Sequence, residues 1–374
     1  MTSPQMAPSS KLSALHDAGV SIWLDTLSRD LLESGDFGAL VHDCSVTGAT
    51  SNPTIFAKAI TTSDRYDDQL RQLASAGEHD TRELFFSLAL DDVRGAARLL
   101  RPEYDRSGGR DGFISFECTP DLADDTEATI AQADDLWRRL GEPNVMIKVP
   151  ATPAGLPAIE ELTRRGININ VTLLFSIERY EQVIDAYIRG LDARAQAGDP
   201  INGIASVASF FLSRIDAKVD PRLSEGSPMR GNVAIASARV AYQRYLKKFA
   251  GERWERLVSL GAKRQRPLWA STGTKNPDYS DVLYISELIG PDVVNTTPEA
   301  TLRAFADHGT VARTLDADPD AARSTLLEAA TAGVDLEAIT TELERDGVRS
   351  FCDSYDQLLA CVTSKLRAVG AVGS

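Results

Sequence analysis

The stretch NVMIKVPATPAGLPAIEELTRRGININVTLL, residues 144–174, contains a complete strand–helix–strand unit and decides the fold. Apolar and polar residues alternate in Asn144–Val149 and again in Ile167–Leu174, as they do in β-strands. Between them, PAGLPAIEELTRRG predicts a helix that ends at Gly166 after two arginines, a common stop signal. A strand, a helix and a second strand in this order predict a parallel βαβ unit.

Segments of the same kind recur on both sides of this unit, with helical stretches such as TEATIAQADDLWRRLG between them. The further predicted strands are Ser21–Asp25, Val46–Asn52, Phe113–Glu117, Ile204–Phe211, Pro267–Ser271 and Val293–Thr296. Together with the first two they make eight, the number that a closed barrel of parallel strands needs. We therefore expect an α/β protein with a (β/α)8, or TIM, barrel.

The spacing of the strands is uneven, and the longer gaps predict additional helices. The segments DRYDDQLRQLASAG and NVAIASARVAYQRYLKKFAGERWERL have helical patterns, and they follow the second and the sixth strand. No linker rich in Pro, Gly or Ser divides the chain, so we expect a single domain over 1–374, with a disordered lead at 1–10. Residues 316–374 are expected to form a helical C-terminal extension after a loop around 316–320. The alternative is a barrel with a small helical appendage.

Composition excludes several classes of partner. The formal net charge of −14 argues against nucleic acid as a ligand, because phosphate backbones favour basic surfaces, yet it leaves room for a small phosphorylated substrate. No apolar run approaches the roughly 18 residues that a membrane span needs. The start MTSPQMAPSSK lacks the order of a signal peptide, so we expect a cytoplasmic protein without a membrane partner.

Cysteines and histidines do not suggest a metal site. The four cysteines contain no CxxC pair, and we expect them to be reduced and mostly buried. The four histidines are scattered without a ligand-like spacing. We therefore predict a reaction that needs no metal. The residues concerned are Cys44, Cys118, Cys352, Cys361, His16, His42, His79 and His308.

Strand alternation predicts where a site would lie. Val145, Ile147 and Val149 share one face of their strand, so Lys148 points to the other face, toward the lumen. The same reasoning, applied to the other strands, brings polar side chains together near the C-terminal strand ends, where barrel enzymes build their active sites. This lumenal set is Asp25, Thr50, Asn52, Glu117, Lys148, Asn170 and Thr172. A single lumenal lysine would fit a structural ion pair, but the whole set is costly to bury without a ligand.

This combination of residues suits imine chemistry. A lysine attacks a ketone as the neutral amine, which burial favours, and the resulting iminium withdraws electrons from a neighbouring carbon–carbon bond. One carboxylate is then needed for the proton of the hydroxyl that becomes a carbonyl, and another for the water lost and regained at the imine. Asp25 and Glu117 are the candidates for these two tasks, and Asn52 and Asn170 can hold substrate hydroxyls.

Six segments, in order and over nearly the whole chain, resemble transaldolases: LDTLSR, GATSNPTIF, NVMIKVPAT, GININVTLLFS, ASVASFFLSR and LWASTGTKNP. The last segment is similar to that of a longer bacterial subgroup. The resemblance implies that Lys148 forms the Schiff base and that Asp25 is the acid/base for the C4 hydroxyl. It also implies that Glu117 and Thr172 position the catalytic water. Residues implied to contact the substrate are Thr50, Asn52, Asn170, Ser209, Phe211, Arg214 and Ser271.

The resemblance fails at one point of the expected phosphate site. Better-known transaldolases carry a second arginine after the serine of strand seven, whereas the next basic residue here is Lys275. We expect Lys275 to take this role together with Arg214, against the alternative of a solvated loop lysine.

The implied reaction transfers a dihydroxyacetone unit without any cofactor in the non-oxidative pentose phosphate pathway. The donor would be sedoheptulose 7-phosphate or fructose 6-phosphate, and the acceptor an aldose phosphate such as glyceraldehyde 3-phosphate or erythrose 4-phosphate. The closest alternative is a fructose-6-phosphate aldolase, which releases dihydroxyacetone. A glycosidase with two carboxylates would not need Lys148, and a sugar-phosphate sensor on an inactive barrel should lack a catalytic group. The sequence predicts no oligomeric state.

Overall fold

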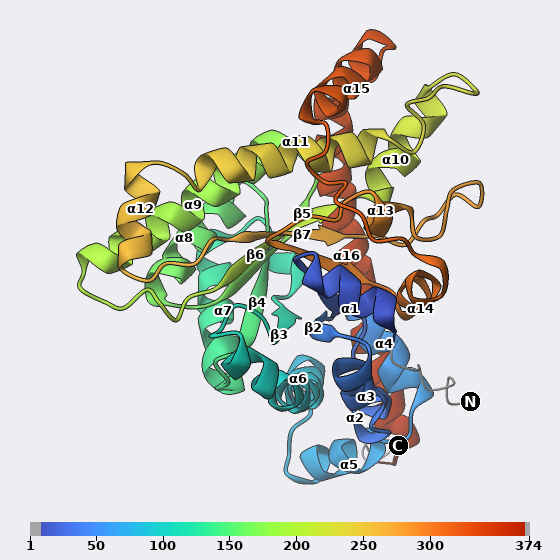
Figure 1. Cartoon of the computed structure of the whole chain (residues 1–374). Coiled ribbons are helices and arrows are strands. Elements are labelled where there is room, and N and C mark those ends of the chain that lie inside the picture. The colour runs from blue at the N-terminus through green and yellow to red at the C-terminus, as the bar shows by residue number, and fades with distance from the viewer. Residues whose placement is uncertain (1–8, 371–374) are drawn as a thin grey trace.

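The computed structural model describes residues 9–370 of the chain. Within these residues, eight parallel strands close into a barrel in chain order, which confirms the predicted (β/α)8 fold (Figure 1). The strands are β1 (Val20–Leu24), β2 (Val46–Thr50), β3 (Phe113–Glu117), β4 (Val145–Pro150), β5 (Ile169–Leu174), β6 (Ser206–Phe211), β7 (Arg266–Ala270) and β8 (Val293–Thr297).

Several predicted strands are one or two residues too long at the end that carries function. Asp25, Asn52 and Ser271 lie just beyond β1, β2 and β7. Asn52 instead caps the next helix, because its side-chain oxygen accepts a hydrogen bond from the N–H of Ile55 at 3.0 Å, and Pro53 follows at the first helical position. The local sequence SNPT therefore ends the strand and starts a helix at the rim of the barrel.

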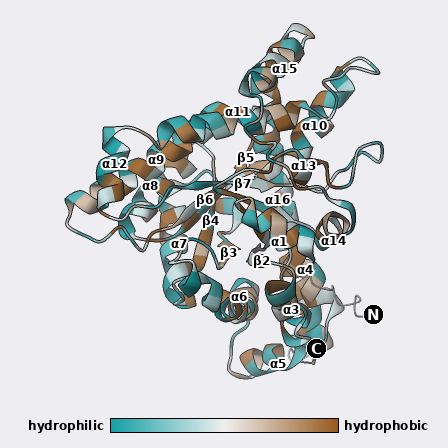
Figure 2. Ribbon diagram, in the orientation of Figure 1, coloured by the Kyte–Doolittle hydropathy of each residue, from teal (hydrophilic) through white to brown (hydrophobic). Residues whose placement is uncertain are grey.

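Helices surround the barrel, with the predicted extra helices after β2 and β6. They are α1 (Ser10–Asp17), α2 (Arg29–Glu33), α3 (Asp36–Asp43), α4 (Pro53–Thr62), α5 (Asp67–Ser75), α6 (Thr81–Arg106), η1 (Pro120–Leu122), α7 (Thr126–Leu140), α8 (Gly155–Arg165), α9 (Ile177–Gln196), α10 (Ser213–Val219), η2 (Asp220–Arg222), α11 (Val233–Lys248), α12 (Glu252–Ser259), α13 (Leu283–Ser286), α14 (Glu299–His308), α15 (Pro319–Thr331) and α16 (Leu336–Ala368). Along them, hydrophobic stretches alternate with hydrophilic ones (Figure 2), as amphipathic helices packed on a core require.

The ends of the chain bear on two further expectations. Residues 1–8 of the predicted disordered lead lie outside the described residues, but Ser10 already begins α1. The predicted C-terminal extension is helical in α15 and α16, while residues 371–374 lie outside the described part. Leu343, Leu358 and Val362 of α16 belong to the same core as the barrel. The single domain stays a prediction, which this shared core supports.

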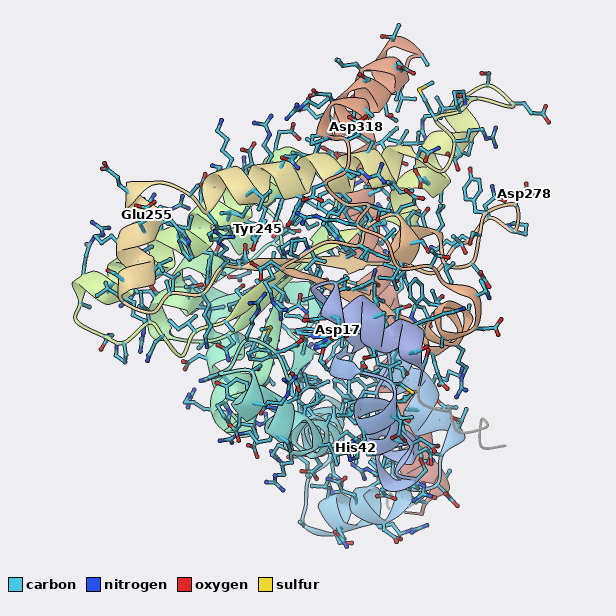
Figure 3. The ribbon with its side chains drawn as sticks, in the orientation of Figure 1. Asp17, His42, Tyr245, Glu255, Asp278 and Asp318 are labelled. Atoms are coloured by element: carbon cyan, nitrogen blue, oxygen red, sulfur yellow. The ribbon has the colours of Figure 1, made fainter. Side chains whose placement is uncertain are left out.

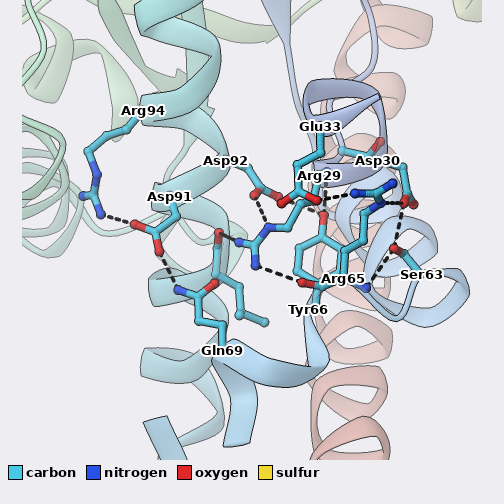
Figure 4. Close-up of polar contacts among 12 residues, drawn as sticks. Arg29, Asp30, Glu33, Ser63, Arg65, Tyr66, Gln69, Asp91, Asp92 and Arg94 are labelled. Carbon is cyan, nitrogen blue, oxygen red and sulfur yellow. Dashed lines mark hydrogen bonds and ion pairs between the residues drawn. The ribbon is translucent and has the colours of Figure 1, made fainter. Parts of the chain in front are cut away.

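A buried ion pair holds the loop that follows β1 (Figure 4). Arg29 Nε lies 2.8 Å from Asp92 Oδ1 of α6, and the Tyr66 hydroxyl donates to Asp92 Oδ2 at 2.8 Å. The Arg29 guanidinium also lies 4.5 Å from the centre of the Tyr66 ring. Burial raises the pKa of Asp92 to about 6, against the opposing effect of Arg29. This network ties the start of α2 to α6, and so fixes the short loop that begins with Asp25.

Two other sequence-based expectations concern cysteines and membranes. Cys44 and Cys118 are buried, whereas Cys352 and Cys361 are only half-buried, so burial of the thiols is less general than expected. Among residues 9–370, no helix is both long enough and apolar enough to cross a membrane.

Candidate active site

A cavity of about 320 Å³ opens at the C-terminal ends of the strands. The strands, the loops after them and the first turns of α4 and α10 contribute Asp25, Thr50, Asn52, Thr54, Ile55, Lys148, Thr172, Ser209, Phe211, Arg214, Ala270, Ser271 and Thr296, and α16 contributes Ser350, Phe351 and Ser354. Most of the predicted site residues therefore meet in one place.

Lys148 lines this cavity and forms a buried pair with Glu117 behind it. They are register partners on β4 and β3, which is why their side chains lie next to each other. Lys148 Nζ lies 3.4 Å from Glu117 Oε2 and donates to the carbonyl of Ser51 at 3.1 Å. The two side chains are only 7% and 8% exposed, so the amine meets solvent mainly through the cavity. A lysine so placed can reach a bound carbonyl group.

Asp25 is the second carboxylate of the site and lies at the end of β1. Its Oδ1 accepts a hydrogen bond from Thr50 Oγ1 at 3.0 Å, and the Thr296 hydroxyl lies 3.0 Å from that of Thr50. Burial raises the pKa of Asp25 above its ordinary value, while Lys148 and the Thr50 hydroxyl oppose this rise. Burial likewise raises the pKa of Glu117, with Lys148 opposing. Both carboxyl groups are therefore tuned toward proton exchange nearer neutral pH than ordinary acids.

Arg214 is a cation that lines the cavity and has no carboxylate partner among residues 9–370. Its guanidinium lies 5.2 Å from the centre of the Phe211 ring, and it makes no hydrogen bond or ion pair with the described residues. Burial lowers the pKa of Arg214, while Asp25 and Glu117 raise it from a distance. A half-buried guanidinium with free N–H groups is suited to bind an anion.

The comparisons with known proteins agree with this geometry. A model of the transaldolase/fructose-6-phosphate aldolase family matches residues 22–362. The chain belongs to this family. It is 49% identical to a transaldolase of Frankia alni, over 98% of this chain and 100% of that protein. It is also 48% identical to a transaldolase of Thermobifida fusca (96% of this chain, 99% of that one) and 45% identical to one of Mycolicibacterium smegmatis (97% and 99%). These relatives support transaldolase over the aldolase alternative, so the chain is an enzyme with transaldolase activity.

Thr172 and Ser271 are two predicted site residues with notable local features. Both line the cavity, and the Thr172 hydroxyl is buried without a hydrogen-bond partner among residues 9–370. Such a hydroxyl is free to bind a water or substrate group. Ser271 has a left-handed backbone with φ 55°, and its hydroxyl lies 2.8 Å from that of Ser213. Strain of this kind often marks a functional position.

Three of the predicted site residues do not line the cavity: Glu117, which reaches it through its contact with Lys148, Asn170 and Lys275. Asn170 lies in the lumen, but its amide donates to Ser115 Oγ at 2.9 Å and its oxygen accepts from Ser209 Oγ at 2.6 Å. Lys275 lies on the loop after β7, which extends away from the barrel toward Asp278 (Figure 3). Burial and the nearby charge of Arg214 lower the pKa of Lys275, so the two cations share one electrostatic environment.

Sequence reasoning missed several residues of the transaldolase cavity. Thr296 of β8 carries no clear alternation signal, because each face of VVNT holds one valine and one polar residue. Ser350, Phe351 and Ser354 carry no local signal, because only the packing of α16 brings them to the barrel.

Residues 9–370 contain no group of three or more His, Cys, Asp or Glu side chains that could hold a metal ion. His42, for example, lies on α3, outside the barrel (Figure 3).

Proposed function

We propose that this enzyme transfers a dihydroxyacetone unit between phosphorylated sugars through an imine on Lys148. The observation that carries the proposal is the buried amine of Lys148 at the cavity, paired with Glu117 and within electrostatic reach of Asp25. The donor would be sedoheptulose 7-phosphate or fructose 6-phosphate, and the acceptor glyceraldehyde 3-phosphate or erythrose 4-phosphate. The cytoplasmic location stays a prediction.

Each side chain then has a separate step. The Lys148 amine adds to the donor ketone, and the carbinolamine loses water to give the iminium. Glu117 moves protons to and from that water, which Thr172 holds. Asp25 takes the proton of the C4 hydroxyl, the bond between C3 and C4 breaks, and its electrons form an enamine on the three-carbon unit. The aldose leaves, the acceptor aldehyde is attacked by the enamine, and hydrolysis of the new imine releases the product ketose.

The remaining cavity residues would orient the substrate. Asn52, Ser209 and Ser271 offer polar groups for sugar hydroxyls, and Arg214 offers a charge for the phosphate. Asn170 would act on the substrate through Ser209, whose hydroxyl it already holds. Lys275 would add positive charge near the phosphate. It lies close enough to Arg214 for the Arg214 charge to lower the pKa of Lys275.

A transfer assay separates the proposed reaction from aldolase activity. Fructose 6-phosphate with erythrose 4-phosphate should give sedoheptulose 7-phosphate and glyceraldehyde 3-phosphate, with little free dihydroxyacetone. EDTA should leave the rate unchanged. Release of dihydroxyacetone from fructose 6-phosphate alone, at the rate of acceptor-dependent turnover, would make the enzyme an aldolase. Loss of activity in EDTA, restored by zinc or magnesium, would contradict the metal-free mechanism.

Arg214→Ala should raise the KM for fructose 6-phosphate by about 10- to 100-fold, because a hydrogen-bonded charge pair contributes roughly 1.5–3 kcal/mol. The kcat should change far less, and the thermal midpoint of unfolding should stay close to that of the wild type. Arg244→Ala, at an exposed arginine of α11 that does not line the cavity, is the matched control. If Arg214→Ala still prefers fructose 6-phosphate over fructose as strongly as the wild type does, Arg214 does not bind the phosphate.

Thr50→Val should move the acid limb of the pH–rate profile to higher pH. The Thr50 hydroxyl stabilises the Asp25 carboxylate, so its loss raises the pKa of Asp25 further, and the ionised base is then lost at a higher pH as the solution is acidified. The measurement is kcat/KM against pH. Thr47→Val changes a threonine of the same strand whose hydroxyl donates to the carbonyl of Ile22, and it should leave the limb in place. An unmoved limb in Thr50→Val would mean that Asp25 does not control it.

A further inference from the structure

Helix α16 supplies one wall of the active-site cavity. Ser350, Phe351 and Ser354 all line it, and Ser354 follows Ser350 by four residues and Phe351 by three, which places the set on one side of the helix. In Figure 1, α16 is one long helix that runs past the strands and α4. The Ser354 hydroxyl lies 3.1 Å from that of Thr54, which follows Pro53 at the start of α4. The C-terminal extension therefore belongs to the site itself.

Close packing sets the position of this face. Gly347, one turn before Phe351, is buried, and a Cβ at this position would lie 3.1 Å from the side chain of Leu173 on β5. The absence of a side chain thus lets α16 approach the end of β5. Tyr355, one turn after Phe351, packs on Phe85 with ring centres 5.9 Å apart. The lining residues are held between two buried contacts.

Ion pairs fix α16 on both sides of the cavity. Lys218 of α10 lies 2.6 Å from Glu342 and 3.1 Å from Asp346, and α10 is the short helix that carries Arg214. Near its C-terminal end, Lys365 lies 3.0 Å from Asp67 of α5. The helix is therefore paired both with α10, the element that presents Arg214, and with α5.

Phe351 contacts the cation that the proposed reaction needs. Its ring centre lies 5.9 Å from the Arg214 guanidinium, while Phe211 of β6 lies at 5.2 Å. Aromatic faces attract a guanidinium and limit its motion without using its N–H groups. Since Arg214 has no carboxylate partner among the described residues, these two rings are the groups that hold it.

We propose that Phe351 is a positioning residue, which holds Arg214 in place for the substrate phosphate. The α16 face of Ser350, Phe351 and Ser354 then completes the phosphate end of the substrate site. The proposal rests on the proposed function, because it assigns Arg214 to the phosphate. It makes the C-terminal extension a determinant of the preference for phosphorylated sugars.

The test compares two donors in a set of Phe351 variants. In Phe351→Ala, the KM for fructose 6-phosphate should rise about 10-fold, as expected for a partly desolvated cation–π contact. The kcat with fructose 6-phosphate and the kcat/KM for fructose should change little. Phe351→Leu keeps apolar volume without a ring and should behave like Phe351→Ala, whereas Phe351→Tyr keeps the ring and should behave like the wild type. Val348→Ala, on the same helix but outside the cavity, is the control for loosened packing.

Two results would overturn the proposal. One is an equal loss of kcat/KM with both donors, which would show a general structural role. The other is an unchanged preference for fructose 6-phosphate in Phe351→Ala. Borohydride trapping of Lys148 with fructose 6-phosphate in the wild type distinguishes a failure of the role of Phe351 from a failure of the proposed function. If the wild type forms the adduct and Phe351→Ala keeps the wild-type preference for fructose 6-phosphate, only the role of Phe351 is contradicted. If the wild type forms no adduct, the proposed function is contradicted.

Discussion

In Asp25→Ala, borohydride should trap the whole donor sugar on Lys148 and not its three-carbon fragment. Imine formation needs the amine and Glu117, which this change leaves in place, whereas cleavage needs a base for the C4 hydroxyl. Asp25 is the carboxylate available for that step, because Glu117 already pairs with Lys148 at 3.4 Å. Turnover should fall by about 10²–10⁴-fold, the usual contribution of a general acid–base group.

The mass of the Lys148 peptide distinguishes the outcomes of this experiment. With fructose 6-phosphate, the reduced adduct in Asp25→Ala should carry six carbons and the phosphate. Asp17→Ala removes an exposed carboxylate on α1, just before β1, and should give the same adduct as the wild type. A three-carbon adduct that accumulates in Asp25→Ala would show that another group performs the cleavage.

Glu117→Gln should slow imine formation itself, again by about 10²–10⁴-fold. Glutamine keeps the shape of the side chain but cannot transfer a proton. It therefore cannot protonate the water that leaves the carbinolamine or deprotonate the water that attacks the imine carbon. The expected signature is a slow appearance of any reduced adduct on Lys148 after rapid mixing with donor and borohydride. Once formed, the imine should still be cleaved, because Asp25 is intact.

The control for Glu117→Gln is the stability of the variant, since Glu117 is buried beside Lys148. A thermal midpoint close to that of the wild type would assign the slow step to chemistry. Adduct formation at the wild-type rate would show that Glu117 does not serve the imine, and the two carboxylates would then have to be reassigned.

The alternation of side chains carried most of the site prediction. In parallel strands with fixed register, a polar residue between two apolar ones must face the lumen, and the pairing of Glu117 with Lys148 and of Lys148 with Asn170 follows. Alternation predicts less at the rim, where Asp25 and Asn52 lie beyond the strands. There the backbone no longer alternates, and caps and turns decide where a side chain points.

Contacts between elements that are distant in the chain could not be predicted from the sequence. Nothing in the segment RSFCDSY indicates that Phe351 touches Arg214, because that contact depends on how Gly347 and the ion pairs seat α16. The motif LDTLSR likewise gives no sign that its arginine, Arg29, pairs with Asp92 of α6. Such pairings depend on tertiary packing, about which the local periodicity of the sequence carries no information.

The most direct test of the account is mass spectrometry of the wild-type protein after borohydride reduction with fructose 6-phosphate. The account predicts one added dihydroxyacetone-sized mass, located on the peptide that contains Lys148. An adduct on another lysine, or no adduct under conditions in which the enzyme turns over, would contradict it.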